Sequence, residues 1–475
     1  MLDIKTIKEK SDTFKKIFFF RVCGTGMGAA ACLLREKGFE VEGGDYNFYP
    51  PMSDYLKETQ IPLSDLNSFD KSKLKDFDLI VVGNVVPKNS EDAKLIESLG
   101  VPYCSFPAAL GALVLSDINV VGIAGTHGKT TTTYYLIQML ENLGEEPGYL
   151  VGGVIEGRPS ALLGKGKYFV IESDEYDSAY FEKISKFRSY SINDLILTSL
   201  EYDHADIFDS VEDIKDEFRC LLKVMPGEVI FNNDYQAARE LQSEFSEIEW
   251  TPYSEDVEKP SAINIVKANE KGTTFKLVVN NEELTFDTNL IGTHNILNLS
   301  SCIFFCQRKG FTISDIKKSI LELNQVKRRQ EIRGKYKGAV VIDDFAHHPR
   351  SVGYTIDGIK MNYPGKKVLV VLEPNSATAR SNIFQAEFAE ALSHADEVIM
   401  AKASRDTTAK NAGNLDYQKV VDSLIQMGRK SCFVTELSAL RESIDSSVTE
   451  NSILLVLSNG TCLDLWKSDF VDHIV

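Results

Sequence analysis

The stretch from Val120 to Gly144, VVGIAGTHGKTTTTYYLIQMLENLG, constrains the fold of this 475-residue chain more than any other. Its apolar beginning, residues 120–123, predicts a short strand buried on both faces. Apolar residues then recur at helical spacing and predict a helix with one apolar stripe, made of Leu136, Met139, Leu140 and Leu143. Gly144 follows where a C-terminal cap is expected. A strand, a glycine turn and a helix in this order predict an α/β fold with an anion-binding loop.

The turn itself, GTHGKTT at residues 125–131, has the chemistry of a phosphate-binding loop. Glycines let backbone N–H groups converge on an anion, and the N-terminus of the following helix adds partial positive charge. Lys129 can reach the β- and γ-phosphates of ATP, and the Thr130 hydroxyl can ligate Mg²⁺. The loop departs from the strict pattern, because Ile123 stands where the first glycine is expected. An ordinary turn with a solvated lysine is the alternative. The predicted ATP-binding residues are Gly125, Thr126, His127, Gly128, Lys129, Thr130 and Thr131.

The charge balance limits the partners of the chain. With 52 basic and 69 acidic residues its net charge is −17, which argues against nucleic acid and membrane surfaces as partners. The eight cysteines form no C-x-x-C pair, no apolar run approaches the ~20 residues that span a membrane, and the N-terminus does not resemble a signal peptide. We therefore expect a cytoplasmic protein of about three domains.

A second glycine turn lies near the start of the chain. A predicted strand at 17–22 is followed by GTGMG at 24–28, a helix, and a second strand that ends in Asp45. This is the layout of a nucleotide-binding βαβ unit, with an acid about 20 residues after the glycines. The glycine spacing is off the strict form, so NAD, another nucleotide and a purely structural turn all stay open. Asn84 lies in a polar loop after the apolar strand 79–82, where such sheets bind ligands.

Two polar segments follow predicted strands in the middle of the chain. ESDEYD at 172–177 comes after the apolar run 168–171, and a carboxylate on a strand beside a phosphate loop can complete a Mg²⁺ site. A solvated acidic turn is the alternative. His204 follows the predicted strand 195–200, where a metal or phosphate contact competes with a capping or packing role.

The rest of the chain continues the α/β pattern after one excursion. Segment 226–290 is rich in β-type runs, and Asn280-Asn281-Glu282 between two of them predicts a hairpin. GTHNILN at 292–298 opens a helix whose polar residues contact a base or phosphate, or only cap the helix. The basic cluster 327–331 is a surface run or a domain junction that presents an Arg to phosphate. From residue 339 on, alternating strands and helices predict a further doubly wound domain.

Together these motifs resemble those of the Mur ligase family, the ATP-dependent amide-forming ligases of peptidoglycan assembly. The motifs are GTGMG at Gly24, GTHGKTTT at Gly125, ESDEYD at Glu172, EYDHAD at Glu201, GTHNILN at Gly292, RRQEIRG at Arg328 and DDFAHHP at Asp343. The resemblance implies an α/β fold with three domains. These are a Rossmann-like UDP-sugar-binding domain (1–116), a central P-loop ATPase domain (117–326) and a Rossmann-like C-terminal ligase domain (327–475).

The resemblance also implies roles for individual residues. The implied catalytic residues are Lys129, Glu172, His204 and Arg329. Mg²⁺ would be held by Thr130, Glu172 and His204. Besides the phosphate loop, ATP would contact Asn295, Arg329, Asp344 and His348. The UDP-sugar site would comprise Gly24, Thr25, Gly26, Met27, Gly28, Asp45 and Asn84.

Within the family, DYNFYPPMS at Asp45 and LEPNSATAR at Leu372 are similar to one branch. That branch joins UDP-N-acetylmuramate to the tripeptide L-Ala-γ-D-Glu-meso-diaminopimelate in peptidoglycan recycling, and the alternative is the branch that adds L-alanine. Asn375 departs from the pattern, because an arginine is expected after Glu-Pro. A non-enzymatic nucleotide-binding protein and an NAD-dependent dehydrogenase built on the GTGMG turn are further alternatives. The dehydrogenase would leave Lys129, Thr130 and the acidic segment without a role.

Overall fold

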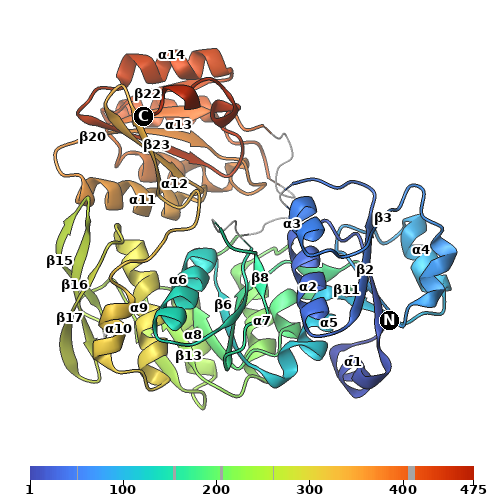
Figure 1. Ribbon diagram of the computed structural model, residues 1–475. Helices are drawn as coiled ribbons and strands as arrows, with labels where there is room; N and C mark the ends of the chain where they lie inside the picture. Colours follow the sequence, from blue (N-terminus) through green and yellow to red (C-terminus); the bar gives the residue numbers. More distant parts are fainter. Residues whose placement is uncertain (51, 153–156, 204–206, 260, 405–411) are drawn as a thin grey trace. The chain divides into compact units, whose positions relative to one another are not determined.

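The computed structural model describes residues 1–50, 52–152, 157–203, 207–259, 261–404 and 412–475 (Figure 1). These residues form two compact units. The first comprises Met1–Leu200, Glu212–Pro252 and Phe304–Phe311, and the second comprises Glu201–Val211, Tyr253–Ile303 and Thr312–Val475. No helix in the described ranges is both long enough and apolar enough to cross a membrane.

The first sheet of the first unit is fully parallel, in the order β3-β2-β1-β4-β5. Its strands are β1 (Lys16–Phe20), β2 (Glu40–Asp45), β3 (Leu63–Asp65), β4 (Leu79–Val82) and β5 (Tyr103–Ser105). The accompanying helices are α1 (Ile4–Glu9), α2 (Thr25–Glu36), α3 (Met52–Glu58), α4 (Glu91–Ser98) and α5 (Phe106–Leu113). The consecutive Phe18, Phe19 and Phe20 are all fully buried, because the central strand of a parallel sheet is covered on both faces. The order confirms the expected Rossmann-like fold.

The second sheet has the order β14-β13-β12-β6-β9-β7-β8, with β6 paired in parallel to β9 and β12. Its strands are β6 (Asn119–Ala124), β7 (Gly148–Leu150), β8 (Ala161–Leu162), β9 (Tyr168–Ser173), β12 (Asp194–Leu197), β13 (Val229–Asn232) and β14 (Trp250–Tyr253). A separate hairpin pairs β10 (Asp177–Ala179) with β11 (Glu182–Ser185). The helices are α6 (Lys129–Asn142), α7 (Val211–Leu222) and α8 (Gln236–Glu244).

Helix α6 corrects one expectation and confirms another. The sequence predicts a single apolar stripe, but every residue from 130 to 140 is buried, threonines and Gln138 included. The hydroxyl of Thr133 donates to the Lys129 carbonyl at 2.9 Å and thereby satisfies its own polarity inside the helix. The predicted cap is present: Gly144 has φ +87°, its N–H donates to Glu141, and Glu145 donates to Leu140. This is a Schellman motif.

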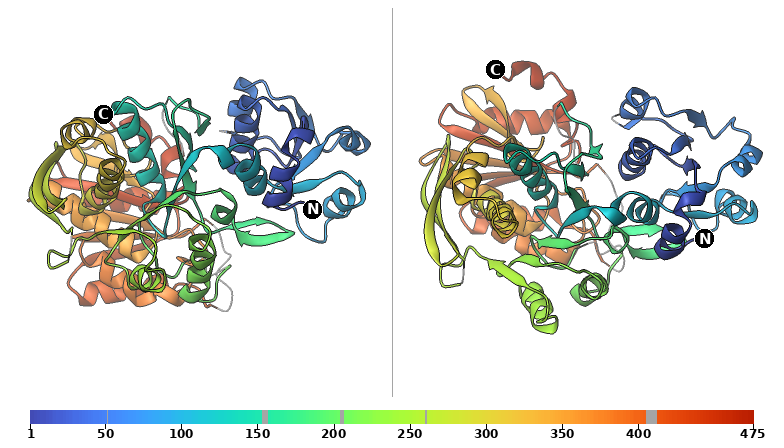
Figure 2. Two further views of the ribbon diagram at one scale, coloured as in Figure 1. Left: turned by 90° about the horizontal axis from the view of Figure 1, so that it is seen from below. Right: turned by 60° about the horizontal axis from the view of Figure 1, so that its bottom comes forward.

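The second unit begins with a small antiparallel sheet, β15-β16-β17. Its strands are β15 (Ile263–Asn269), β16 (Gly272–Val279) and β17 (Glu282–Thr288). Asn280 and Asn281 join β16 to β17 with positive φ angles of 53° and 65°, which confirms the predicted hairpin. The sheet lies beside α9 (Thr293–Arg308) and α10 (Ile313–Ser319) in both figures (Figures 1 and 2), and Lys317 of α10 packs on the Phe286 ring at 5.5 Å.

The last sheet has the order β18-β19-β23-β20-β21-β22, and only β18 runs antiparallel to its neighbour among these described strands. Its strands are β18 (Glu331–Tyr336), β19 (Ala339–Asp344), β20 (Lys367–Glu373), β21 (Glu397–Ala401), β22 (Lys430–Val434) and β23 (Ser452–Ser458). The helices are α11 (Pro349–Asn362), α12 (Gln385–Leu392), α13 (Tyr417–Gln426) and α14 (Leu437–Ser447).

Strand β20 shows why this domain needs helices on both sides of its sheet. Val368, Val370 and Leu372 enter the hydrophobic core beneath α11, α12 and α13. Leu369 and Val371 point the other way, into the core beneath α14. Figure 1 shows α14 on the opposite face of the sheet from α11 and α12. Successive side chains of β20 thus point to opposite faces of the sheet, and each face is covered by helices. This is a doubly wound domain, which confirms the expected fold class.

Candidate nucleotide-binding site

Two glycines with positive φ angles shape the loop between β6 and α6. Gly125 has φ +133°, and a Cβ there would lie 2.5 Å from the Thr198 hydroxyl and 2.6 Å from the Ser199 carbonyl. Gly128 has φ +81° and is the N-cap residue of α6. The helix therefore starts directly at Lys129, so that its unpaired N–H groups and partial positive charge face the loop.

The end of β12 fixes the phosphate loop from the side. The Thr198 hydroxyl lies against the carbonyl oxygens of Ala124, at 3.1 Å, and His127. The backbone N–H of His127 donates to the Ser199 hydroxyl at 2.7 Å. The predicted strand 195–200 included both residues, but the strand ends at Leu197, so Thr198 and Ser199 are free to bind the loop. Their role was missed because it depends on β12 pairing with β6, which no local pattern shows.

Lys129 reaches back over the loop. Its Nζ donates to the Gly125 carbonyl at 2.6 Å and pairs with Glu175 Oε2 at 3.0 Å. The side chains of Lys129 and Glu175 are only 13% and 3% exposed. Burial alone would lower the pKa of Lys129, but Glu175 and Glu172 raise it above its usual value. The ammonium group therefore stays charged, as a phosphate ligand must.

The predicted Mg²⁺ ligands of the first unit lie next to each other. The Thr130 hydroxyl donates to Glu172 Oε1 at 2.7 Å, and the Gly152 N–H donates to Oε2 at 2.8 Å. The strand register explains this position, because Glu172 pairs with Ile123 at the end of β6. A hydroxyl and a carboxylate are the hard oxygen donors that Mg²⁺ prefers, together with phosphate oxygens and water. The donor set therefore fits this ion.

The third predicted metal ligand cannot be compared with this pair. His204 lies outside the described residues. Among the residues that are described, no group of three or more His, Cys, Asp or Glu side chains is arranged to hold a metal ion. A site built on Thr130 and Glu172 would therefore depend on the nucleotide to complete its coordination.

The glycine turn of the first sheet has a packing function. Helix α2 begins at Thr25, with Gly24 as its N-cap. A Cβ on Gly26 would lie 2.9 Å from the Phe106 ring, and one on Gly28 would lie 2.2 Å from the Met52 sulfur. These two glycines let α5 and α3 approach α2 closely. Thr25, the first residue of α2, is exposed, so the N-terminus of this helix is accessible. Met27 is buried.

Asp45 is the last residue of β2, and its buried carboxylate is hydrogen-bonded. Its Oδ1 accepts from the Tyr46 N–H at 2.8 Å and pairs with Arg21 at 2.9 Å, and its Oδ2 accepts from the Cys23 N–H at 2.9 Å. The carboxylate thus fixes the backbone just before GTGMG. Asn84 is exposed in the turn after β4. The contacts of these residues with a UDP-sugar stay a prediction.

The second unit brings together another part of the predicted ATP site. Asn295, in the first turn of α9, donates to the Ile291 carbonyl at 2.8 Å and to Gln330 Oε1 at 3.2 Å. The Gln330 backbone N–H donates to Asp344 Oδ2 at 2.8 Å, and its amide nitrogen lies 3.1 Å from His294 Nε2. Gln330 therefore connects two predicted ATP ligands, although the sequence suggested no role for it.

Arg329 and His348 lie near Asp344. The Arg329 guanidinium lies 4.9 Å from the centre of the Phe345 ring. Burial raises the pKa of Asp344, and Arg329 opposes that shift. His348 is the N-cap residue of α11, and its ring packs edge-on against Phe384 at 4.7 Å. Burial lowers the pKa of His348 to about 4, although Asp203 opposes this. The imidazole is therefore neutral at pH 7 and can accept a hydrogen bond.

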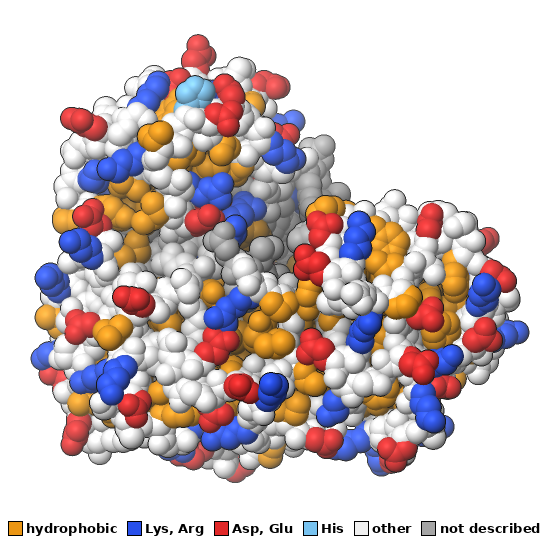
Figure 3. All heavy atoms as spheres, in the orientation of Figure 1, with side chains coloured by type: hydrophobic (Ala, Val, Ile, Leu, Met, Phe, Trp, Pro, Cys, Tyr) orange, Lys and Arg blue, Asp and Glu red, His pale blue; other side chains and the backbone are white. Residues whose placement is uncertain are grey.

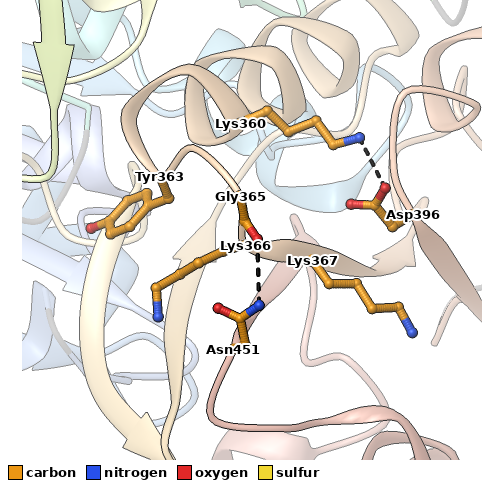
Figure 4. Close-up of a pocket in the computed structure, with 7 residues that line it drawn as sticks. All are labelled: Lys360, Tyr363, Gly365, Lys366, Lys367, Asp396 and Asn451. Atoms are coloured by element: carbon orange, nitrogen blue, oxygen red, sulfur yellow. Dashed lines mark hydrogen bonds and ion pairs between the residues drawn. The ribbon is translucent and has the colours of Figure 1, made fainter.

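A cavity of about 590 Å³ lies away from these residues (Figure 4). It lies beside Lys367, which begins β20, and Asn451, which precedes β23, whereas Asp344 ends the parallel strand β19. The cavity is thus at the opposite edge of the sheet. An ion pair between Lys360 and Asp396, at 3.2 Å, occupies one side of it. Open α/β sheets bind ligands at the carboxyl ends of their strands, so we do not assign the nucleotide to this cavity.

The surface shows no single-sign region on the face drawn in Figure 3, where acidic and basic side chains are interspersed. None of the eight cysteines, all of which lie in the described ranges, forms a disulfide.

Comparison with known proteins supports the same reading over nearly the whole chain. Three family models match: "Mur ligase family, catalytic domain" at residues 16–117, "Mur ligase middle domain" at 123–306, and "Mur ligase, glutamate ligase domain" at 328–460. The UDP-N-acetylmuramate–L-alanyl-γ-D-glutamyl-meso-2,6-diaminoheptandioate ligase of Escherichia coli is 33% identical over 94% of this chain and 95% of its own length.

Two further relatives match the chain over nearly its whole length at lower identity. The UDP-N-acetylmuramate–L-alanine ligase of Desulfitobacterium hafniense is 28% identical over 95% of this chain and 98% of its own length. The crystal structure of a murein peptide ligase from Psychrobacter arcticus is 26% identical, covers 97% of this chain and 99% of its own, and superposes with a TM-score of 0.64. The motifs, the three wound sheets and these full-length matches agree, and the chain belongs to the Mur ligase family.

Proposed function

We propose that this chain is the ATP-dependent ligase that joins UDP-N-acetylmuramate to the tripeptide L-Ala-γ-D-Glu-meso-diaminopimelate, with release of ADP and phosphate. The observation that carries the proposal is the 33% identity, over 94% of the chain, to a ligase named for this reaction. The alanine-adding relative is less similar, at 28%. The product would return cell-wall peptide to peptidoglycan synthesis, and so contribute to cell shape and division.

In the proposed reaction, ATP phosphorylates the lactyl carboxylate of UDP-N-acetylmuramate. Activation is needed because a carboxylate is a poor electrophile. The tripeptide's alanyl amine attacks the acyl phosphate, and the tetrahedral intermediate collapses to an amide and phosphate. Lys129 lies where it would neutralise charge on the transferring phosphoryl group. Mg²⁺, when held by Thr130 and Glu172, would supply further electrostatic stabilisation of the phosphates. His204 would add a ligand for a second ion.

The remaining residues would bind and orient the substrates. Asn295, in its hydrogen-bonded position at the start of α9, would contact adenine, and Arg329 the γ-phosphate. Asp344 and His348 would contact ATP from the last domain. The N-terminus of α2, with residues 24–28, Asp45 and Asn84, would bind the UDP part of the sugar nucleotide. Domain closure would then exclude water from the acyl phosphate.

We place the domain limits at 1–116, 117–326 and 327–475. In this arrangement the central domain would hold the triphosphate that activates the acid delivered by the first domain. We also propose that the protein acts in the cytoplasm, because eight cysteines without a disulfide suit a reducing compartment and its co-substrate would be ATP.

The assay that tests this proposal compares two amines. The purified chain receives ATP, Mg²⁺ and UDP-N-acetylmuramate with either L-alanine or the tripeptide, and phosphate release is followed. We expect release with the tripeptide and none with L-alanine. Release with L-alanine alone would favour the alanine-adding function, and release with neither would exclude both. Lys129→Ala should abolish release while UDP-sugar binding survives.

A further inference from the structure

Lys129 of the phosphate loop forms a buried ion pair with Glu175, a carboxylate that has no role in the reaction described above. Glu175 lies two residues after Ser173, the last residue of β9, and its carboxylate pairs with Lys129 Nζ at 3.0 Å. The pair is buried, with exposures of 13% for Lys129 and 3% for Glu175. A carboxylate thus contacts the one ammonium group that must bind the phosphates of a nucleotide.

The segment that carries Glu175 is fixed on both sides. The Ser185 hydroxyl, at the end of β11, donates to the Glu175 carbonyl at 2.9 Å. The preceding Asp174 pairs with a different lysine, Lys186, at 2.9 Å. Two adjacent acids therefore serve two different lysines, and only the buried one faces the phosphate loop. Asp174 is a natural control for Glu175.

Lys129 has three N–H donors, and two of them are used by Gly125 and Glu175. Phosphate oxygens of a nucleotide bound to Lys129 would lie within a few ångströms of the Glu175 carboxylate. Like charges at that separation repel strongly in a buried site. Phosphate and Glu175 therefore compete for the same ammonium group.

We propose that Glu175 occupies the place of a phosphate oxygen at Lys129 in the nucleotide-free protein, and that the nucleotide displaces it. The inference rests on the proposed function, because it takes ATP to bind at Lys129. Glu175 is in this view a positioning residue. It holds the lysine over the loop and lowers nucleotide affinity so that product ADP can leave.

The inference makes a prediction opposite to that for a metal ligand or a purely structural residue. In Glu175→Gln the nucleotide no longer displaces a carboxylate, and the free protein loses a partner of buried Lys129. Both effects favour the bound state, so the variant should bind nucleotide about tenfold more tightly than the wild type. Its melting temperature without nucleotide should fall, and saturating nucleotide should restore it.

The experiment measures the Kd for ADP and for ATP, each with Mg²⁺, by titration calorimetry on the full chain. It compares the wild type with Glu175→Gln, Glu175→Asp, Asp174→Asn and Lys129→Ala. We expect Asp174→Asn within about twofold of the wild type, and Glu175→Asp between the wild type and Glu175→Gln. If Glu175→Gln does not fold, Glu175→Asp still tests the inference, because its shorter side chain weakens the pair while keeping the charge.

Unchanged or weaker binding by the folded Glu175 variants would overturn the inference. If instead the wild type binds no nucleotide, or Lys129→Ala binds as tightly as the wild type, the proposed ATP site itself is wrong. The two failures are therefore distinguishable.

Discussion

Glu172 and Thr130 are in direct contact in the candidate site, with 2.7 Å between the hydroxyl and the carboxylate. The Gly152 N–H holds the second carboxylate oxygen and so fixes the direction in which the first one points. The Glu172 charge also raises the pKa of buried Lys129. The effect of a Glu172 substitution on metal binding is therefore measured by its Mg²⁺ dependence, which a loss of these internal contacts would not change.

Glu172→Gln keeps the shape of the side chain but removes its charge and replaces one of its two acceptor oxygens by an NH2 donor. Mg²⁺ would lose its anionic protein ligand, so we expect roughly 100-fold lower turnover at a fixed Mg²⁺ concentration, with partial recovery as Mg²⁺ is raised. Phosphate release across a Mg²⁺ titration measures this. Asp174→Asn, in the same segment, is the control. Equal Mg²⁺ dependence in Glu172→Gln and the wild type would exclude Glu172 as a ligand.

The titration of His348 makes the free energy of unfolding depend on pH. Its pKa is about 4 in the folded protein, because it is buried, and about 6.5 when unfolded. The unfolded state therefore binds a proton between these values and the folded state does not. The contribution of His348 to the free energy of unfolding is therefore present above pH 6.5 and is lost as the pH falls toward 4. The loss between pH 7 and pH 5 is about 2 kcal/mol.

His348→Gln removes the titrating group, so the free energy of unfolding should fall less between pH 7 and pH 5 than in the wild type. Urea unfolding at the two pH values measures the difference. An unchanged pH dependence in His348→Gln would contradict the assignment of a buried, neutral imidazole.

At the scale of elements, the phosphate loop depends on where β12 ends relative to β6. Thr198 and Ser199 lie against the loop because Leu197 pairs with Ala124 in the sheet. Gly125 is the point where this packing leaves no room for a side chain. The same register, on the other side of β6, brings Glu172 to Thr130. The loop is thus shaped by both neighbouring strands.

Gly125→Ala tests this arrangement. The new Cβ would lie 2.5 Å from the Thr198 hydroxyl, at a φ of +133° that alanine rarely adopts. We expect a loss of about 3 kcal/mol in stability and no detectable ATP binding. Gly38→Ala is the matched control, with φ +110° and no atom within 4 Å of the added Cβ. It should lose only about 1–2 kcal/mol and keep ATP binding. Similar losses in both variants would contradict the packing argument.

Local patterns were sufficient to predict most elements near the site. The β6–loop–α6 unit, the GTGMG turn and the Asn280–Asn281 hairpin were all expected from spacing and turn chemistry. The burial of α6 on all sides was not expected, because it depends on neighbours that a single helix sequence does not contain. Thr198, Glu175 and Gln330 were missed for the same reason. Each of them acts on a residue far away in the chain.

For the whole molecule, the predicted ATP ligands belong to both compact units. Lys129, Thr130 and Glu172 are in the first, and Asn295 and Asp344 are in the second. Within the first unit a hydrogen bond connects Thr130 to Glu172, and within the second unit Gln330 connects Asn295 to Asp344.

Oxygen labelling tests the central chemical claim, that ATP activates the lactyl carboxylate as an acyl phosphate. UDP-N-acetylmuramate labelled with ¹⁸O in that carboxylate is incubated with ATP, Mg²⁺, the tripeptide and the wild-type chain. Attack of the amine breaks the bond between the carbonyl carbon and the labelled oxygen, so each released phosphate should carry one ¹⁸O by mass spectrometry. Amide product accompanied by unlabelled phosphate would contradict the account.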